Sequence, residues 1–198
     1  MPNHVTNILV VSGDEQQRQA MFEAIKNDEI GLGSIDFNKV IPMPETIFRG
    51  NLGQAERTKY GSANWYDWSI ANWGTKWNSY GYDDVTTPKE FDGERMEFQT
   101  AWSYPAPIIA RLAEKYPDLH FEVKWADEDF GYNVGHKEYE NGEEIFCNQP
   151  DGGSKEALEL AAEVHDLDLA DEGYLFNEAK GKYEYHDPEE APMSMQMQ

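Results

Sequence analysis

The residue types best suited to binding chemistry are concentrated in one aromatic stretch, residues 72–78, which reads Asn-Trp-Gly-Thr-Lys-Trp-Asn. Lys76 stands between Trp73 and Trp77, and Trp65 and Trp68 lie just upstream, so four of the six tryptophans fall within thirteen residues. Indole rings bury much apolar area and keep a polar edge, which suits both cores and interfaces. The stretch therefore predicts either an aromatic plug in the core or a binding surface.

These two interpretations use the same side chains differently. In the first, Trp68, Trp73 and Trp77 seal the sheet, and Lys76 stacks on an indole as a cation–π contact. In the second, a groove receives a ligand or a partner. Its candidate residues are Trp73, Lys76, Trp77, Asn78, Tyr80 and Tyr82. Aromatic platforms do stack nucleic-acid bases, but the strongly negative chain argues against free nucleic acid as the ligand.

Other kinds of site receive less support from the sequence. The five histidines show no helical pair spacing, and Cys147 is the only cysteine, so we expect no metal, no disulfide within one chain and no cofactor. Asp127, Asp129 and Glu138 match three positions of a calcium loop, but Tyr132 replaces its required glycine. We therefore expect a solvated link between two strands there. Without a nucleophile elbow, the sequence predicts no catalytic residue.

The formal charge of −22 is unevenly spread along the chain. Residues 118–150 carry 9 acidic and 2 basic side chains, and residues 151–198 carry 13 and 3. Such a field repels nucleic acid and anionic membranes and attracts basic partners. The acidic-surface candidates are Glu163, Asp166, Asp168, Asp171 and Glu172. They either gather on one face or are spread evenly to keep the protein soluble, and the sequence leaves both possibilities open.

Residues 1–4 lack the features of a secretory signal, and no apolar run approaches the ~20 residues that span a bilayer. We therefore expect a soluble, cytoplasmic protein with no membrane contact. The oligomeric state is left open.

The elements expected in the first half begin with a strand at 5–11 and a helix at 15–28 capped by Asp14. A second strand is predicted at 36–41. Residues 45–92 then form an aromatic helical insert, in which Asn64 caps a helix that ends at Gly74.

In the second half, residues 95–102 alternate as a half-buried strand, with Met96, Phe98, Thr100 and Trp102 on its inner face. A helix capped by Ser103 follows, then a strand at 119–125, a hairpin at 132–139 and 143–148, and a helix at 155–164. This order predicts an α+β fold: a ferredoxin-like split βαβ sheet with an aromatic helical insert and an added C-terminal hairpin and helix. Two helices should cover the sheet face that holds Phe98 and Phe121. The expected domains are 1–150, an acidic helical extension packed on it at 151–186, and a flexible tail at 187–198.

Several of these motifs together resemble the YubB-like family of plasmid and phage proteins. They are the opening Met1-Pro2-Asn3, the alternating strand that ends at Gly13, the stretch at residues 72–78, and the segment at residues 100–103. The resemblance covers about residues 1–150, and His4 departs from the family pattern. It implies a ferredoxin-like fold and a mobile-element origin, and no established reaction.

Two function classes follow from these features. The first is a non-enzymatic interaction module for a protein with a basic surface, in its sharpest form an acidic decoy or inhibitor of a basic host protein. The second is a small-molecule or nucleotide-binding domain, enzymatic or not, that uses the aromatic insert as its pocket.

Overall fold

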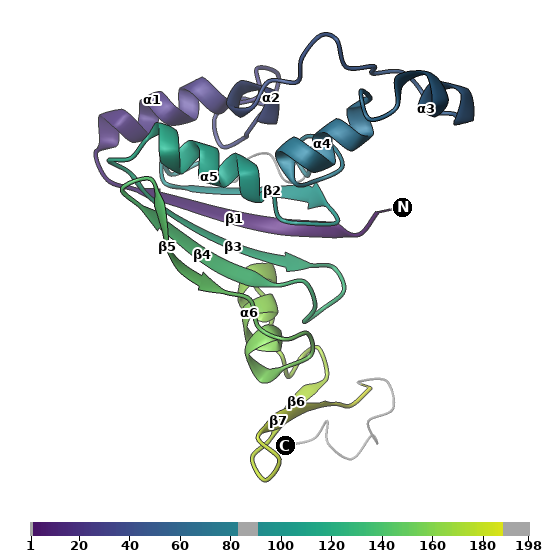
Figure 1. Ribbon diagram of the computed structural model, residues 1–198. Coiled ribbons are helices and arrows are strands. Elements are labelled where there is room, and N and C mark those ends of the chain that lie inside the picture. The colour runs from purple at the N-terminus through teal and green to yellow at the C-terminus, as the bar shows by residue number, and fades with distance from the viewer. Residues whose placement is uncertain (1, 83–90, 188–198) are drawn as a thin grey trace.

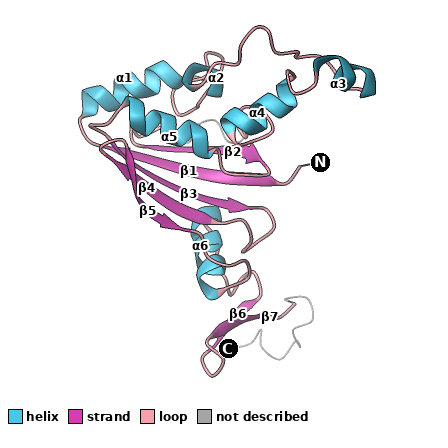
Figure 2. Cartoon of the chain, viewed as in Figure 1, coloured by secondary structure: helices cyan, strands magenta, loops and turns pink. Residues whose placement is uncertain are grey.

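The computed structural model describes residues 2–82 and 91–187. Helices cover one face of a β-sheet, and a further helix lies on its other face (Figure 1, Figure 2). The elements of the described residues, in chain order, are β1 (His4–Ser12), α1 (Glu15–Ile25), α2 (Phe37–Val40), α3 (Gln54–Tyr60), α4 (Trp65–Trp73), β2 (Arg95–Ala101), α5 (Ala106–Lys115), β3 (His120–Asp127), β4 (Gly135–Glu140), β5 (Glu143–Asn148), α6 (Lys155–His165), β6 (Tyr174–Asn177) and β7 (Lys182–Tyr185).

Within the described residues, the main sheet has five strands in the order β2-β1-β3-β4-β5, and every neighbouring pair is antiparallel. Because β2 and β3 both pair antiparallel with β1, they run parallel to each other with β1 between them. Helix α5 connects them. This is the split βαβ arrangement of ferredoxin-like folds. The predicted α+β class, the split βαβ unit and the β4–β5 hairpin are confirmed.

The main core lies between this sheet and the helices above it. Along β1, Val5, Leu9 and Val11 are fully buried, as the period of two in a strand requires for one covered face. Phe98 of β2 and Phe121 of β3 lie in the same core, which confirms their prediction.

Two predicted helices, α1 and α5, supply much of the cover. In α1, the Asp14 carboxylate accepts a hydrogen bond from the backbone N–H of Gln17 (3.0 Å), which confirms the expected cap. The second cap prediction is wrong. Helix α5 begins after Pro105, whereas the Ser103 hydroxyl donates to the carbonyl of Gly74 (2.6 Å) and ties the insert to the strand end.

The predicted strand at residues 36–41 is wrong, because Phe37–Val40 form the short helix α2. The Asp36 side chain accepts from the backbone N–H of Asn38 and caps this turn. The N–H of Phe37 donates to Oδ1 of Asn78 (2.8 Å) instead of to a strand. The Phe37 ring enters the core, 5.8 Å from Trp73 between ring centroids. The cap from Asp36 and the burial of Phe37 together favour the helical turn over the strand that the residue pattern predicted.

The insert carries α3 and α4 and returns to the sheet edge at Tyr80. The backbones of Tyr80 and Gln99 exchange two hydrogen bonds of 3.0 and 2.8 Å along β2. Helix α4 confirms both of its predicted boundaries. Asn64 accepts from the N–H groups of its first turn, and Gly74 ends it in the left-handed conformation (φ 77°).

The lower face of the sheet is covered at one end by α6 (Figure 1). A second apolar cluster forms there, in which Ala157, Ala161 and Val164 pack against Ala126 and Ile8. The chain then forms a two-stranded sheet, β6–β7, that projects away from the main sheet (Figure 1). The sequence pattern did not predict this hairpin.

Candidate functional site

The first part of the tryptophan stretch lies in the core. Trp73 is 3% exposed, and its indole N–H donates to the carbonyl of Ile41 (2.9 Å). Its ring contacts Phe37 and Trp68 edge to face. Thr75 is also buried, and its hydroxyl donates to the carbonyl of Ala101 (2.7 Å). For these residues the plug interpretation matches the geometry.

Asn78, Tyr80 and Tyr82 also make internal contacts. The Asn78 amide donates to Asp36 (2.7 Å), and the Tyr82 hydroxyl accepts from the N–H of Ile35 (3.2 Å). Burial raises the pKa of Tyr82 above its ordinary value. Asn78 and Tyr82 therefore connect the insert to the segment just before α2.

Tyr80 sits at the sheet edge with its hydroxyl turned inward. That hydroxyl lies 2.6 Å from Nδ1 of His4 and donates to the carbonyl of Thr100 (3.1 Å). Burial, followed by the negative charges of Glu128 and Asp127, raises its pKa to about 12. The phenol therefore stays protonated at neutral pH and acts as a donor.

Lys76 and Trp77 are partly exposed, and Lys76 meets an indole from another segment. The Lys76 ammonium lies 4.4 Å from the ring centroid of Trp77 and 4.8 Å from that of Trp102. Trp102 was predicted to lie on the inner face of its strand, and this prediction is wrong. Strand β2 ends at Ala101, and Trp102 has a φ of 73° and is 41% exposed.

Asp127 explains why Trp102 turns outward. Its carboxylate, 4% exposed, accepts from the side-chain amides of Asn3 (3.0 Å) and Asn133 (2.9 Å). The amide of Asn133 also donates to the carbonyl of Trp102, and the N–H of Trp102 donates to the carbonyl of Asn3. The expectation of a solvated link is therefore wrong at Asp127, which is a buried acceptor that joins three segments.

The acidic candidates separate into two groups. Glu163 and Asp166 lie at the C-terminal end of α6 and line a pocket. Asp168, Asp171 and Glu172 lie on the link between α6 and β6. Within residues 2–82 and 91–187, none of these last three forms an ion pair, whereas Glu163 pairs with Lys124 (2.6 Å).

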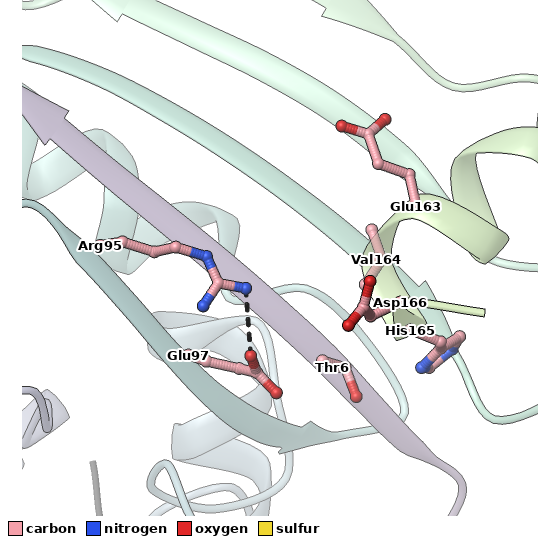
Figure 3. Close-up of a pocket in the computed structure, with 7 residues that line it drawn as sticks. All are labelled: Thr6, Arg95, Glu97, Glu163, Val164, His165 and Asp166. Carbon is pink, nitrogen blue, oxygen red and sulfur yellow. Dashed lines mark hydrogen bonds and ion pairs between the residues drawn. The ribbon is translucent and has the colours of Figure 1, made fainter. Parts of the chain in front are cut away.

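The pocket has a volume of about 370 Å³ and lies between β1, β2 and the end of α6 (Figure 3). A neighbouring pocket of about 220 Å³ shares Arg95 and Glu163 with it. Most of the charge on the pocket lining is already compensated by ion pairs. Arg95 pairs with Glu97 (3.2 Å), and Glu163 pairs with Lys124. The full lining of the larger pocket is Thr6, Arg95, Glu97, Glu163, Val164, His165 and Asp166.

This pocket offers little for catalysis. Nε2 of His165 lies 3.1 Å from the carbonyl of Asp127, which can only accept, so this nitrogen carries a proton and is not a free base. The lining residues include no serine or cysteine nucleophile. The charged and polar lining suits a small polar molecule.

Among the residues that the structure describes, no three His, Cys, Asp or Glu side chains gather closely enough to hold a metal ion. Cys147 is exposed on β5. In the same residues, no helix is both long and apolar enough to cross a membrane. The sequence predictions on metals, cofactors and cellular compartment remain predictions.

Fold and site together define a ferredoxin-like α+β protein. A family model described as "Ferredoxin-like domain in Api92-like protein" matches residues 72–168, from the tryptophan stretch through α6. Over these residues the chain is similar to Api92-like proteins. The match supports the predicted ferredoxin-like family but carries a different description, so the YubB-like assignment remains a prediction.

A solved structure, that of protein Api92 from Yersinia pseudotuberculosis, is 16% identical with a TM-score of 0.35. The match covers 47% of this chain and 32% of that one. No curated protein matches the chain.

Proposed function

We propose that the protein is a non-enzymatic interaction module that binds a basic, partly apolar surface of another protein. The binding element is the acidic arm, defined as residues 166–187, which includes β6 and β7. The observation that carries the proposal is the set of large apolar side chains that the arm leaves exposed among its carboxylates. They are Leu167, Leu175, Phe176 and Tyr185, each between 42% and 60% exposed.

The arm is anchored at its base and projects beyond it (Figure 1). Tyr174 stacks on Phe130 with 5.4 Å between ring centroids, and the Tyr183 hydroxyl donates to Glu159 of α6 (3.2 Å). A two-stranded hairpin is only marginally stable by itself in water. Apolar side chains left exposed on such an element favour an interaction partner that covers them.

The charge of the arm supports a basic partner. Residues 166–187 contain seven acidic and two basic side chains. Glu184 pairs with Lys180, and this contact, followed by a hydrogen bond from Asn177, lowers the pKa of Glu184. Carboxylates with no cation nearby steer a basic partner and increase its association rate, while the apolar anchors supply most of the affinity.

A host DNA-binding protein is the sharpest form of this proposal. The resemblance to plasmid and phage proteins supports it, because carboxylates on the arm could occupy a groove built for phosphates. The interior roles of Trp73, Asn78, Tyr80 and Tyr82 favour this class over a pocket formed by those residues.

The test compares two variants with the same change in charge. The first variant neutralises the link between α6 and β6 by the substitutions Asp168→Asn, Asp171→Asn and Glu172→Gln. The control variant neutralises three exposed carboxylates elsewhere. The control substitutions are Glu29→Gln, Glu45→Gln and Asp118→Asn. Partners captured from host lysate are identified, purified and titrated against each protein at several salt concentrations.

We expect the link variant to lose affinity and salt dependence, and the control to bind like the wild type. Leu175→Ser should weaken binding further without changing the salt dependence. If both charge variants lose the same affinity, the arm contributes only to the overall charge of the protein, and the proposal is contradicted.

A further inference from the structure

Trp102 is a bulky residue held in a backbone conformation that it rarely adopts. Its φ is 73°, in the left-handed region that favours glycine, and its indole is 41% exposed. This conformation costs free energy in any non-glycine residue, and the exposed ring gains little from burial in return. An observed outlier of this kind indicates a function for the exposed side chain.

The surrounding structure fixes Trp102 firmly. Its N–H and its carbonyl both form hydrogen bonds of 2.9 Å, the first with the carbonyl of Asn3 and the second with the amide of Asn133. Both asparagine side chains also donate to the buried Asp127 carboxylate. The indole is therefore presented on a rigid base, which lowers the entropy lost when a ligand stacks on it.

Other aromatic and cationic side chains lie close to Trp102 or to one another. Tyr66 of α4 lies 6.2 Å from Trp102 between ring centroids, nearly perpendicular to it, and the Arg57 guanidinium lies 5.4 Å from the Tyr66 ring. The Lys76 ammonium lies 4.8 Å from the ring centroid of Trp102 and 4.4 Å from that of Trp77. We call these five residues the Trp102 platform. It has three rings and two cations.

The charge near the platform differs from that of the whole chain. Residues 46–82 contain four basic and two acidic side chains, whereas the acidic arm lies at the opposite end of the molecule (Figure 1). At physiological salt the field of a charge is screened over about 8 Å. Lys76 and Arg57 supply the positive charge at the platform, while the Asp127 carboxylate, joined to the Trp102 carbonyl through Asn133, supplies a negative charge beneath it. An anion at the platform should therefore pair directly with Lys76 or Arg57.

We infer that the Trp102 platform binds a mononucleotide, with the base stacked on the Trp102 indole and the phosphate paired with Lys76 or Arg57. Aromatic faces stack any base, and neighbouring cations bind phosphate. A single nucleotide fits better than a strand, because the platform has only three rings and a longer polyanion would meet the acidic remainder of the protein.

The test is calorimetric titration of the full chain with adenosine monophosphate, adenosine and inorganic phosphate. Trp102→Gly removes the ring while suiting the positive φ, so the fold should be kept, and affinity should fall roughly tenfold. Trp102→Phe should keep most of the affinity. Ile70→Ala, at an exposed position of α4, is the control and should bind like the wild type.

Lys76→Gln with Arg57→Gln tests the phosphate contact separately. This variant should bind adenosine monophosphate no better than it binds adenosine. The inference is overturned if the wild type does not bind adenosine monophosphate, or if Trp102→Gly binds it unchanged. It is equally overturned if phosphate or adenosine alone matches the nucleotide, or if a single-stranded oligonucleotide binds more tightly.

Discussion

Replacing Trp73 by alanine tests whether the tryptophan stretch is part of the core. The side chain is 97% removed from solvent, since 3% remains exposed. A buried indole of about 200 Å² at ~25 cal/mol/Å² gives roughly 5 kcal/mol, at the top of the ~3–5 kcal/mol range for such deletions. For a chain of this size the melting temperature should fall by about 6–20 °C.

The measurement is urea unfolding followed by circular dichroism, with two companion variants. Trp73→Phe keeps a ring beside Phe37 but leaves the carbonyl of Ile41 without its donor, which should cost about 1–3 kcal/mol. Ile70→Ala, exposed on the same helix, should change stability by about 0.5 kcal/mol. If Trp73→Ala also stays within about 1 kcal/mol of the wild type, the plug interpretation is refuted.

Three further predictions concern other contacts of the fold. Gly135→Ala would place a Cβ 2.1 Å from the Trp125 ring and should cost about 1–3 kcal/mol in urea unfolding, so wild-type stability would contradict this packing. Asn64→Ala removes the cap of α4 and should cost about 0.5–2 kcal/mol, whereas Asn64→Ser, which keeps a capping oxygen, should restore part of it. Tyr80 has a pKa raised from 10.0 to about 12, so the unfolded state loses this proton first and stability falls as pH rises through that window. Tyr80→Phe should lessen this alkaline loss in unfolding curves, and an unchanged pH slope would show that Tyr80 does not cause it.

The elements that the sequence predicted correctly are those set by local interactions. Helix α4 begins and ends where Asn64 and Gly74 place it, because capping and the left-handed glycine act within a few residues. The strand predicted at 36–41 failed because the local cap from Asp36 acts together with a remote contact. The amide of Asn78, 41 residues further along the chain, bonds the N–H of Phe37.

The candidate site shows the same division. Lys76 and Trp77 were identified from the aromatic stretch, but Trp102 was assigned to the buried face of its strand. Its orientation depends on Asn3 and Asn133, which lie far from it in the sequence. The β6–β7 hairpin was missed because its strands have four residues each, too few to show a period of two.

The whole-chain charge of −22 is a poor guide to what each surface binds. The ferredoxin-like sheet separates the Trp102 platform, with the cations Lys76 and Arg57, from an acidic arm at the other end (Figure 1). Because screening limits each field to its own neighbourhood, the two ends favour ligands of opposite sign. Added salt should therefore weaken binding at both ends, and neutralising one end should leave the other unchanged. A protein that behaved as a uniform polyanion would instead gain affinity for anions at the insert whenever carboxylates on the arm were removed.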